Sequence, residues 1–123
     1  MIGSTRNVKV FIHNEPTDLR KGYNGLFALA RDVLHCDPLS GHIFLFVSRN
    51  RKRCKALHWD GNGLAIYMKR AEDFLFIAPW ERCSGGRPCE MTTAELALFL
   101  QGSKAVRTSL SPRPYVIEQS QRD

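Results

Sequence analysis

Hydrophobic and polar residues alternate along several segments of this chain, and a period of two predicts β-strands. Residues 8–13, 53–60 and 64–69 show this alternation. Residues 42–47 form a continuous apolar run, which is typical of a strand covered on both faces. Residues 74–78 form a further short apolar run. The pattern therefore predicts five short strands.

Two other segments carry apolar residues at helical spacing. The longer one spans residues 18–34, with Thr17 as the expected N-cap. The shorter one spans residues 92–101 and opens with a capping-box signature, in which Thr92 is followed three residues later by Glu95. These patterns predict one longer helix and one short C-terminal helix.

Short turns between the strands predict how these elements are arranged. The Gly-Asn-Gly sequence at 61–63 is a strong turn signal, and residues 79–90 are expected to form a loop. Strands joined by short turns favour an antiparallel meander of four or five strands. The predicted fold is α+β, with this meander packed against the longer helix and residues 1–102 forming a single domain. Residues 103–123 are rich in Ser, Arg, Gln and Pro, which predicts a mostly disordered basic tail.

The positive charge of the chain is concentrated in one place. The formal net charge is +6, and five of the eighteen Lys and Arg residues lie within 49–55. Without those five, the chain has thirteen basic and twelve acidic residues. Because a strand precedes the segment and another follows it, the segment reads as a hairpin tip. A local concentration of cations attracts polyanions such as nucleic acid.

Two further pairs of cations extend this prediction. Arg20 and Lys21 fall in the first turn of the predicted helix, where the helix dipole and free N–H groups favour an anion. An equally good interpretation is that Arg20 and Lys21 are simply surface residues, whose charges are tolerated there because Asp18 lies beside them. Lys69 and Arg70 lie on the next strand, where they would widen the basic face. The residues predicted to contact nucleic acid are Arg20, Lys21, Arg49, Arg51, Lys52, Arg53, Lys55, Lys69 and Arg70.

Other interpretations of these residues stay open. The basic hairpin is also compatible with a solvated surface turn or with a site for an acidic protein. Trp59 fits a core position, or a base-stacking position if its ring is exposed. Asp60 is expected to hydrogen-bond within the 61–63 turn.

Catalytic and metal-binding patterns are missing from the sequence. It contains no P-loop, no G-x-S-x-G and no H-E-x-x-H, and its aspartates are scattered over different elements. We therefore expect no enzymatic activity, no cofactor and no metal site. The chain has no apolar run long enough to span a bilayer and no signal-peptide segment, so we expect a cytoplasmic protein. In that compartment its four cysteines would be reduced thiols.

Four segments, taken in order, resemble a known family. They are residues 18–26 (Asp-Leu-Arg-Lys-Gly-Tyr-Asn-Gly-Leu), 37–46 (Asp-Pro-Leu-Ser-Gly-His-Ile-Phe-Leu-Phe), 50–63 (Asn-Arg-Lys-Arg-Cys-Lys-Ala-Leu-His-Trp-Asp-Gly-Asn-Gly) and 69–70 (Lys-Arg). Together they resemble the small accessory protein of the insertion-sequence-sixty-six transposon family. This Orf2-like or TnpB-type protein is unrelated to the RNA-guided TnpB nucleases. The chain departs from the family pattern at residues 71–73 and in the loop 81–90.

The resemblance implies a bacterial protein that assists transposition without cutting DNA. It also implies that the transposase is a separate, larger protein, which we expect as a partner. The basic residues predict the other partner, which is DNA in duplex form. Two alternatives remain: a protein-only adaptor that docks on the transposase, and an RNA-binding regulator.

Overall fold

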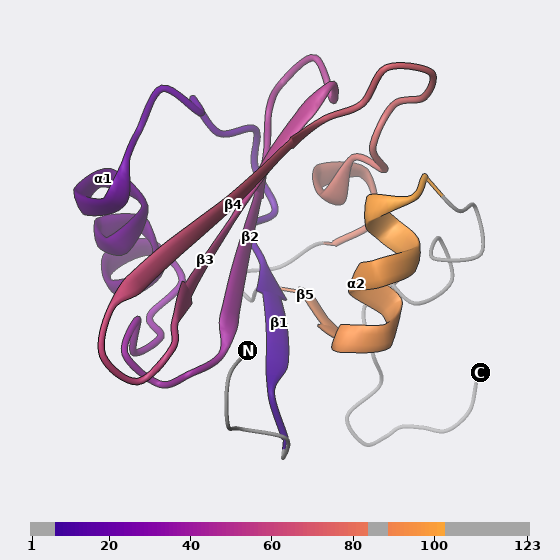
Figure 1. Ribbon diagram of the computed structural model, residues 1–123. Coiled ribbons are helices and arrows are strands. Elements are labelled where there is room, and N and C mark those ends of the chain that lie inside the picture. Colours follow the sequence, from indigo (N-terminus) through magenta and orange to yellow (C-terminus); the bar gives the residue numbers. More distant parts are fainter. Residues whose placement is uncertain (1–6, 84–88, 103–123) are drawn as a thin grey trace.

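The computed structural model of the protein describes residues 7–83 and 89–102 (Figure 1). Within these ranges one mixed sheet is flanked by helical segments. In chain order the elements are β1 (Lys9–Ile12), α1 (Tyr23–Ala28), the π-helical turn η1 (Leu29–Val33), β2 (Ile43–Val47), β3 (Arg53–Trp59), β4 (Leu64–Arg70), the 3-10 turn η2 (Pro79–Glu81), β5 (Cys89–Thr92) and α2 (Thr93–Leu100).

The sheet has the strand order β4-β3-β2-β1-β5. The hairpins β2–β3 and β3–β4 are antiparallel, as predicted, but β1 pairs with β2 in parallel, with Val10 opposite Ile43. The prediction of a purely antiparallel meander is therefore wrong, although the α+β class is confirmed. The reason is that α1 and η1 lie between β1 and β2 in the chain, and a crossover through a helix returns the chain in the same direction.

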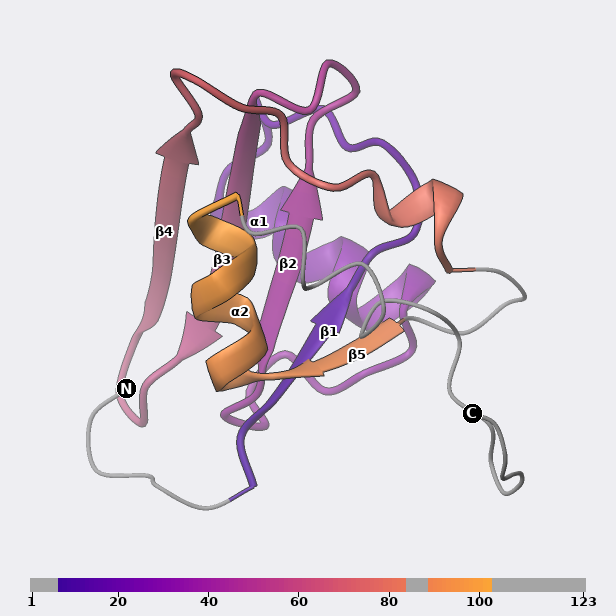
Figure 2. The same ribbon diagram turned by 90° about the vertical axis from the view of Figure 1, so that its right-hand side faces the viewer.

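The helices cover opposite faces of the sheet (Figures 1 and 2). On the α1-side face, Phe44, Phe46 and Leu57 pack in one core cluster with residues of α1 and η1 such as Leu26 and Ala30. On the α2-side face, a second cluster joins the sheet to α2. Its fully or almost fully buried members include Val10, Ile12, Leu45, Phe76, Met91 and Phe99. All five residues of β2 are buried, which confirms the prediction of a strand covered on both faces.

Residues 74–78 do not form the predicted strand. At the middle of the segment, the Phe76 N–H donates to the Arg51 carbonyl at 2.8 Å. Phe76 is nonetheless fully buried and stacks on Phe99 of α2, with ring centroids 5.4 Å apart. A short apolar run has the same composition whether it extends a sheet or covers one, so the pattern could not distinguish the two.

The fifth strand is β5 instead, which falls in the segment 79–90 predicted as a loop and at the start of the predicted short helix. It pairs antiparallel with β1, with Met91 opposite Val10. Cys89 and Met91 are buried whereas Glu90 and Thr92 are exposed, so the strand has the expected alternation over only four residues. The Gly- and Pro-containing sequence before it concealed this strand.

The longer helix begins later than predicted. Its N-cap is Gly22, which makes no side-chain capping bond, and Thr17 is not the cap. Asp18 explains the delay, because its carboxylate accepts the Arg20 backbone N–H at 3.0 Å and holds a local turn in place of a helical one. From Leu29 the helix continues as the π-helical turn η1.

The short C-terminal helix follows the prediction closely. The Thr92 hydroxyl accepts the Glu95 N–H at 3.1 Å, and the Glu95 carboxylate accepts the Thr92 N–H at 2.8 Å. This is the predicted capping box. Gly102 follows the helix with a φ of 77°, in the left-handed region that favours glycine. The predicted tail, residues 103–123, lies outside the described residues.

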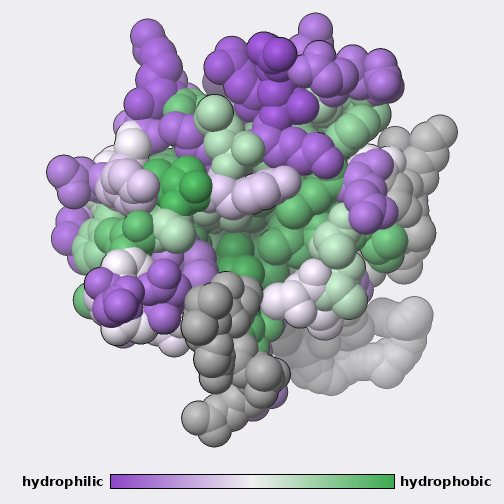
Figure 3. Space-filling model, in the orientation of Figure 1, coloured by the Kyte–Doolittle hydropathy of each residue, from purple (hydrophilic) through white to green (hydrophobic). Residues whose placement is uncertain are grey.

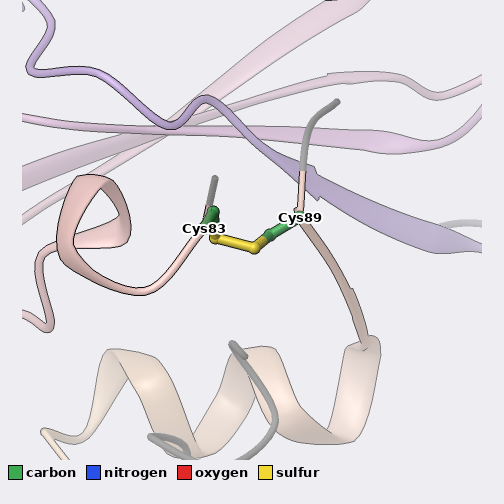
Figure 4. Close-up of a disulfide and its surroundings, with 2 residues drawn as sticks. All are labelled: Cys83 and Cys89. Carbon is green, nitrogen blue, oxygen red and sulfur yellow. A yellow bond between two sulfur atoms is a disulfide. The ribbon is translucent and has the colours of Figure 1, made fainter. Parts of the chain in front are cut away.

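A disulfide joins Cys83 to Cys89 (Figure 4). It links the segment after η2 to the start of β5, with the two Cα atoms 5.8 Å apart. The expectation of four free thiols is therefore wrong for this pair, because β5 brings Cys89 back beside Cys83. Cys36 and Cys54 are free. Burial raises the pKa of the Cys54 thiol to about 12. Among the described residues, no helix combines the length and apolar character needed to cross a bilayer.

Candidate nucleic-acid interface

The predicted basic hairpin is present and its tip is ordered by hydrogen bonds. Residues 48–52 connect β2 to β3, and the Ser48 N–H donates to the Arg53 carbonyl at 3.0 Å. The Asn50 side-chain oxygen accepts both the Ser48 hydroxyl at 2.8 Å and the Lys52 N–H at 3.0 Å. The tip therefore has a defined shape, and it presents Arg49, Lys52 and Arg53 as exposed side chains.

Arg51 differs from the other cations of the tip. Its backbone is left-handed, with a φ of 63°. Its Nε donates to the Phe76 carbonyl at 2.8 Å, while its own carbonyl accepts the Phe76 N–H at 2.8 Å. The side chain is half-buried. Arg51 thus fixes the tip against the segment that covers the α2-side core, and its guanidinium has a structural partner.

Lys55 lies on the α1-side face of β3, opposite Met68. Its ammonium donates to the Lys21 backbone carbonyl at 2.9 Å. This bond holds the loop before α1 next to the strand. Lys21 and Lys55 are therefore neighbours, although 34 positions separate them in the sequence.

Arg53 lies directly opposite Arg70 in the β3–β4 register. Like charges that face each other across a sheet destabilise it. Arg70 also pairs with Glu72 at 2.9 Å, but both side chains are largely exposed, so the pair contributes little. Within the described residues, no carboxylate pairs with Arg53.

Lys69 lies on the other face of the sheet, opposite Cys54. Its ammonium donates to the Leu100 carbonyl at 2.7 Å, at the C-terminal end of α2 where the helix dipole favours a cation. The predicted widening of the basic face therefore applies to Arg70 and not to Lys69, because successive residues of a strand point to opposite faces.

A depression of about 450 Å³ lies between the hairpin tip and the loop before α1. Three arginines that are far apart in the sequence or on different elements, Arg20, Arg49 and Arg53, lie together around it. Its lining residues are Thr17, Asp18, Leu19, Arg20, Ser48, Arg49, Asn50 and Arg53. Sequence reasoning had selected the arginines but missed Thr17, Ser48 and Asn50, whose polar side chains complete the depression. The only signal for them was their position at the ends of predicted elements.

Arg20 and Lys21 do not occupy a helix N-terminus, because α1 begins at Tyr23. The predicted placement of this pair in the first turn of the helix is therefore wrong. Arg20 instead makes a two-pronged ion pair with Asp18, with Nη2–Oδ2 and Nε–Oδ1 distances of 2.7 and 3.0 Å. These hydrogen bonds hold the pKa of the Asp18 carboxyl well below its usual range. The Arg20 side chain remains 91% exposed, so its outer edge faces solvent.

The cations around the hairpin tip form what we call the basic surface. Figure 3 shows hydrophilic side chains gathered at the end of the sheet where the hairpin tip and the adjoining loops lie. The basic surface consists of Arg20, Lys21, Arg49, Lys52, Arg53, Lys55 and Arg70.

Trp59 and Asp60 lie away from the basic surface. Trp59 is half-buried at the end of β3, opposite Leu64, six residues from Arg53 and therefore about 20 Å from it along the strand. The Asp60 carboxylate accepts the N–H groups of Asn62 and Gly63 at 3.2 and 3.1 Å, which confirms the predicted turn. Across residues 7–83 and 89–102, no three His, Cys, Asp or Glu side chains are grouped in a way that could hold a metal ion.

Comparison with known proteins identifies the family. A family model described as IS66 Orf2 like protein matches residues 8–109. Two proteins of Sinorhizobium fredii, both described as uncharacterized, are similar over most of their length. The protein y4jC is 32% identical over 112 residues, which cover 91% of this chain and 93% of that protein. The protein y4hO is 32% identical over 102 residues, covering 83% of this chain and 86% of that protein.

No solved structure matches the chain. The matched region contains every element of the sheet, both helices and the whole basic surface. It also contains the four segments whose resemblance to the family was noted from the sequence. This chain belongs to the IS66 Orf2-like family, the accessory proteins of a group of transposable elements.

Proposed function

We propose that this protein assists transposition as a non-catalytic, nucleic-acid-binding protein, with duplex DNA held on the basic surface. The observation that carries the proposal is the convergence of Arg20, Arg49 and Arg53 around one depression. These residues come from the loop before α1, the hairpin tip and β3, so the fold and not the local sequence brings them together. The cytoplasm, where bacterial DNA lies, is the expected place of action.

The electrostatics of the hairpin support an anionic ligand. Arg53 faces Arg70 across the strand pair, an arrangement that costs stability in the absence of a ligand. A phosphate backbone that approaches this face would offset the repulsion and release condensed counterions. The depression is open and three arginines line it, which suits a phosphate group more than a buried apolar ligand.

The spacing of the cations also suits a backbone contact. Arg49 and Arg53 flank the hairpin tip, while Lys55 and Arg70 continue along the α1-side face of the sheet. A strip of cations of this kind follows a phosphate backbone and positions a protein on it without reading bases. We therefore expect little sequence preference from these residues.

The test is a titration of the protein against duplex DNA, single-stranded DNA and RNA at two salt concentrations. Each phosphate contact with duplex DNA contributes about 0.9 to the slope of log affinity against log salt. The double variant Arg49→Ala/Arg53→Ala should therefore lower the slope by about 1.8. A matched control is Arg31→Ala, which removes an exposed arginine that pairs with Asp32 on η1, away from the hairpin. Binding with an unchanged slope in the double variant would contradict the proposal.

Two other results would point to the alternative functions. Retention of the transposase of the same element without retention of DNA would favour the protein-only adaptor. Tighter binding to RNA than to duplex DNA would favour the RNA-binding regulator.

A further inference from the structure

Strand β4 is the outer edge of the sheet on one side (Figure 2). Edge strands expose unpaired backbone groups, and most proteins protect them with prolines, bulges or charges. The first five residues of β4, from Leu64 to Met68, contain neither a proline nor a charge. Tyr67 and Met68 are 52% and 57% exposed. This edge therefore has the properties of a strand that pairs with another strand.

The hydrogen-bond pattern shows which backbone groups face outward. The Ala71 N–H donates to the Lys52 carbonyl at 2.7 Å, which makes these two residues a hydrogen-bonded pair with β3. Hydrogen-bonded and non-hydrogen-bonded pairs alternate along an antiparallel ladder. The residues of β4 whose N–H and C=O groups point away from β3 are therefore Leu64, Ile66, Met68 and Arg70.

We propose that two copies of this chain pair antiparallel along β4 and form one continuous sheet through a twofold axis at Tyr67. This register places Leu64 of one copy opposite Arg70 of the second, and Ile66 opposite Met68. It uses the outward backbone groups of all four residues on each strand, which no other antiparallel register does. Tyr67 faces Tyr67 of the second copy as a non-hydrogen-bonded pair, with Cα atoms about 4.5 Å apart.

The distribution of charge along β4 favours a second copy of this chain as the partner that pairs with this edge. Four cations, Lys52, Arg53, Lys69 and Arg70, outnumber the two acids Glu72 and Asp73 at one end of β4, while the turn before its other end contains Asp60. Antiparallel self-pairing brings the cationic end of each copy toward the Asp60 end of the other. Parallel pairing would bring the two basic ends together, so it would lack this complementarity. The edge is thus complementary to itself in one direction only.

The pairing also determines how the basic surfaces of the two copies lie relative to each other. A twofold axis perpendicular to the sheet puts the α1-side faces of both copies on the same side. The two basic surfaces would then share one face of the dimer, at opposite ends of the paired strands. The pairing itself does not depend on DNA binding, so it can be tested without nucleic acid.

The first test compares two substitutions at one exposed position. Met68→Pro removes one outward N–H and leaves the β3–β4 ladder intact, whereas Met68→Ala removes the same side chain and keeps the N–H. In sedimentation equilibrium the wild-type chain and Met68→Ala should have twice the mass of the monomer, and Met68→Pro should have the monomer mass. Circular dichroism checks that each variant is folded.

The second test fixes the register and does not rely on the proline variant. Tyr67→Cys should form a disulfide-linked dimer under mild oxidation, because the two Cα atoms meet at the axis within the range that a disulfide spans. Ala65→Cys should not, because it would face Lys69 of the second copy. The wild-type chain treated in the same way controls for Cys36 and Cys54. A monomeric wild-type chain, or a dimer that forms no Tyr67→Cys link, would overturn the proposal.

Discussion

Replacing Arg51 with alanine tests whether Arg51 has a structural role, in contrast to the other cations of the hairpin, which we expect to bind DNA. The substitution removes the hydrogen bond from Nε to the Phe76 carbonyl, which is 2.8 Å long. A hydrogen bond to a charged group contributes about 1.5–3 kcal/mol to stability. Because Arg51 is only half-buried, we expect the free energy of unfolding to fall by about 1.5 kcal/mol, the lower end of that range.

The backbone conformation supplies a control at the same position. The φ of 63° is unfavourable for alanine as well as for arginine, whereas glycine adopts it without strain. Arg51→Gly loses the same hydrogen bond but gains relief of that strain, partly offset by the greater freedom of glycine in the unfolded chain. We therefore expect Arg51→Gly to be about 0.5–1 kcal/mol more stable than Arg51→Ala.

Urea unfolding followed by tryptophan fluorescence measures these differences, and DNA titrations at several salt concentrations provide the second readout. Arg51→Ala should leave the salt slope unchanged, whereas Arg53→Ala should lower it by about 0.9 with little loss of stability. A stable Arg51→Ala variant whose salt slope falls like that of Arg53→Ala would refute this reasoning. It would show that Arg51 contacts phosphate and that its bond to Phe76 is dispensable.

Three further predictions concern stability. Gly102→Ala should lower the free energy of unfolding by about 1–2 kcal/mol in the same urea assay, because alanine is strained at its φ of 77° and the new Cβ would lie 2.7 Å from the Phe74 ring. Reducing the Cys83–Cys89 disulfide with dithiothreitol should lower the free energy of unfolding by about 2 kcal/mol, as expected for a short closed loop. Dithiothreitol should not change the urea midpoint of the Cys83→Ser control; a change there would show an effect of the reagent and not of the disulfide. Burial lowers the pKa of His13 from 6.5, so the unfolded chain binds a proton at this imidazole more readily than the folded chain. The free energy of unfolding should therefore be highest above about pH 6.5 and fall as the pH drops below that value. His13→Gln should reduce this pH dependence.

The parts of the fold that the sequence predicted are those fixed by local patterns. The β2–β3 and β3–β4 hairpins follow from alternating strands joined by polar turns, and the α2 cap follows from Thr92 and Glu95. Each of these features depends on residues close together in the chain, so short-range chemistry decides it.

The errors share a different cause, which is pairing between distant segments. The parallel pairing of β1 with β2 and the pairing of β5 with β1 join distant segments, since Val10 lies opposite both Ile43 and Met91. Residues 74–78 have the apolar character of a strand, but the segment crosses the α2-side core and anchors on Arg51 instead. Local periodicity is the same for both outcomes.

The candidate site shows the same division between local and distant information. The sequence identified a run of cations, but only the fold shows which of them bond to backbone carbonyls and which remain exposed. Arg51, Lys55 and Lys69 donate from their charged groups to backbone carbonyls, at Phe76, Lys21 and Leu100 respectively. Within the described residues, Arg49, Lys52 and Arg53 have no such partner.

That separation strengthens the case for an anionic ligand. If the hairpin carried charge only for solubility, there would be no reason for the fold to place Arg53 opposite Arg70 and to bring Arg20 beside Arg49. Cations spread over the surface would keep the protein soluble at a lower cost in mutual repulsion. Within the described residues, Arg49 and Arg53 have no carbonyl or carboxylate partner, and they line one open depression together with the exposed Arg20. A phosphate backbone is the ligand that would neutralise several of these cations at once.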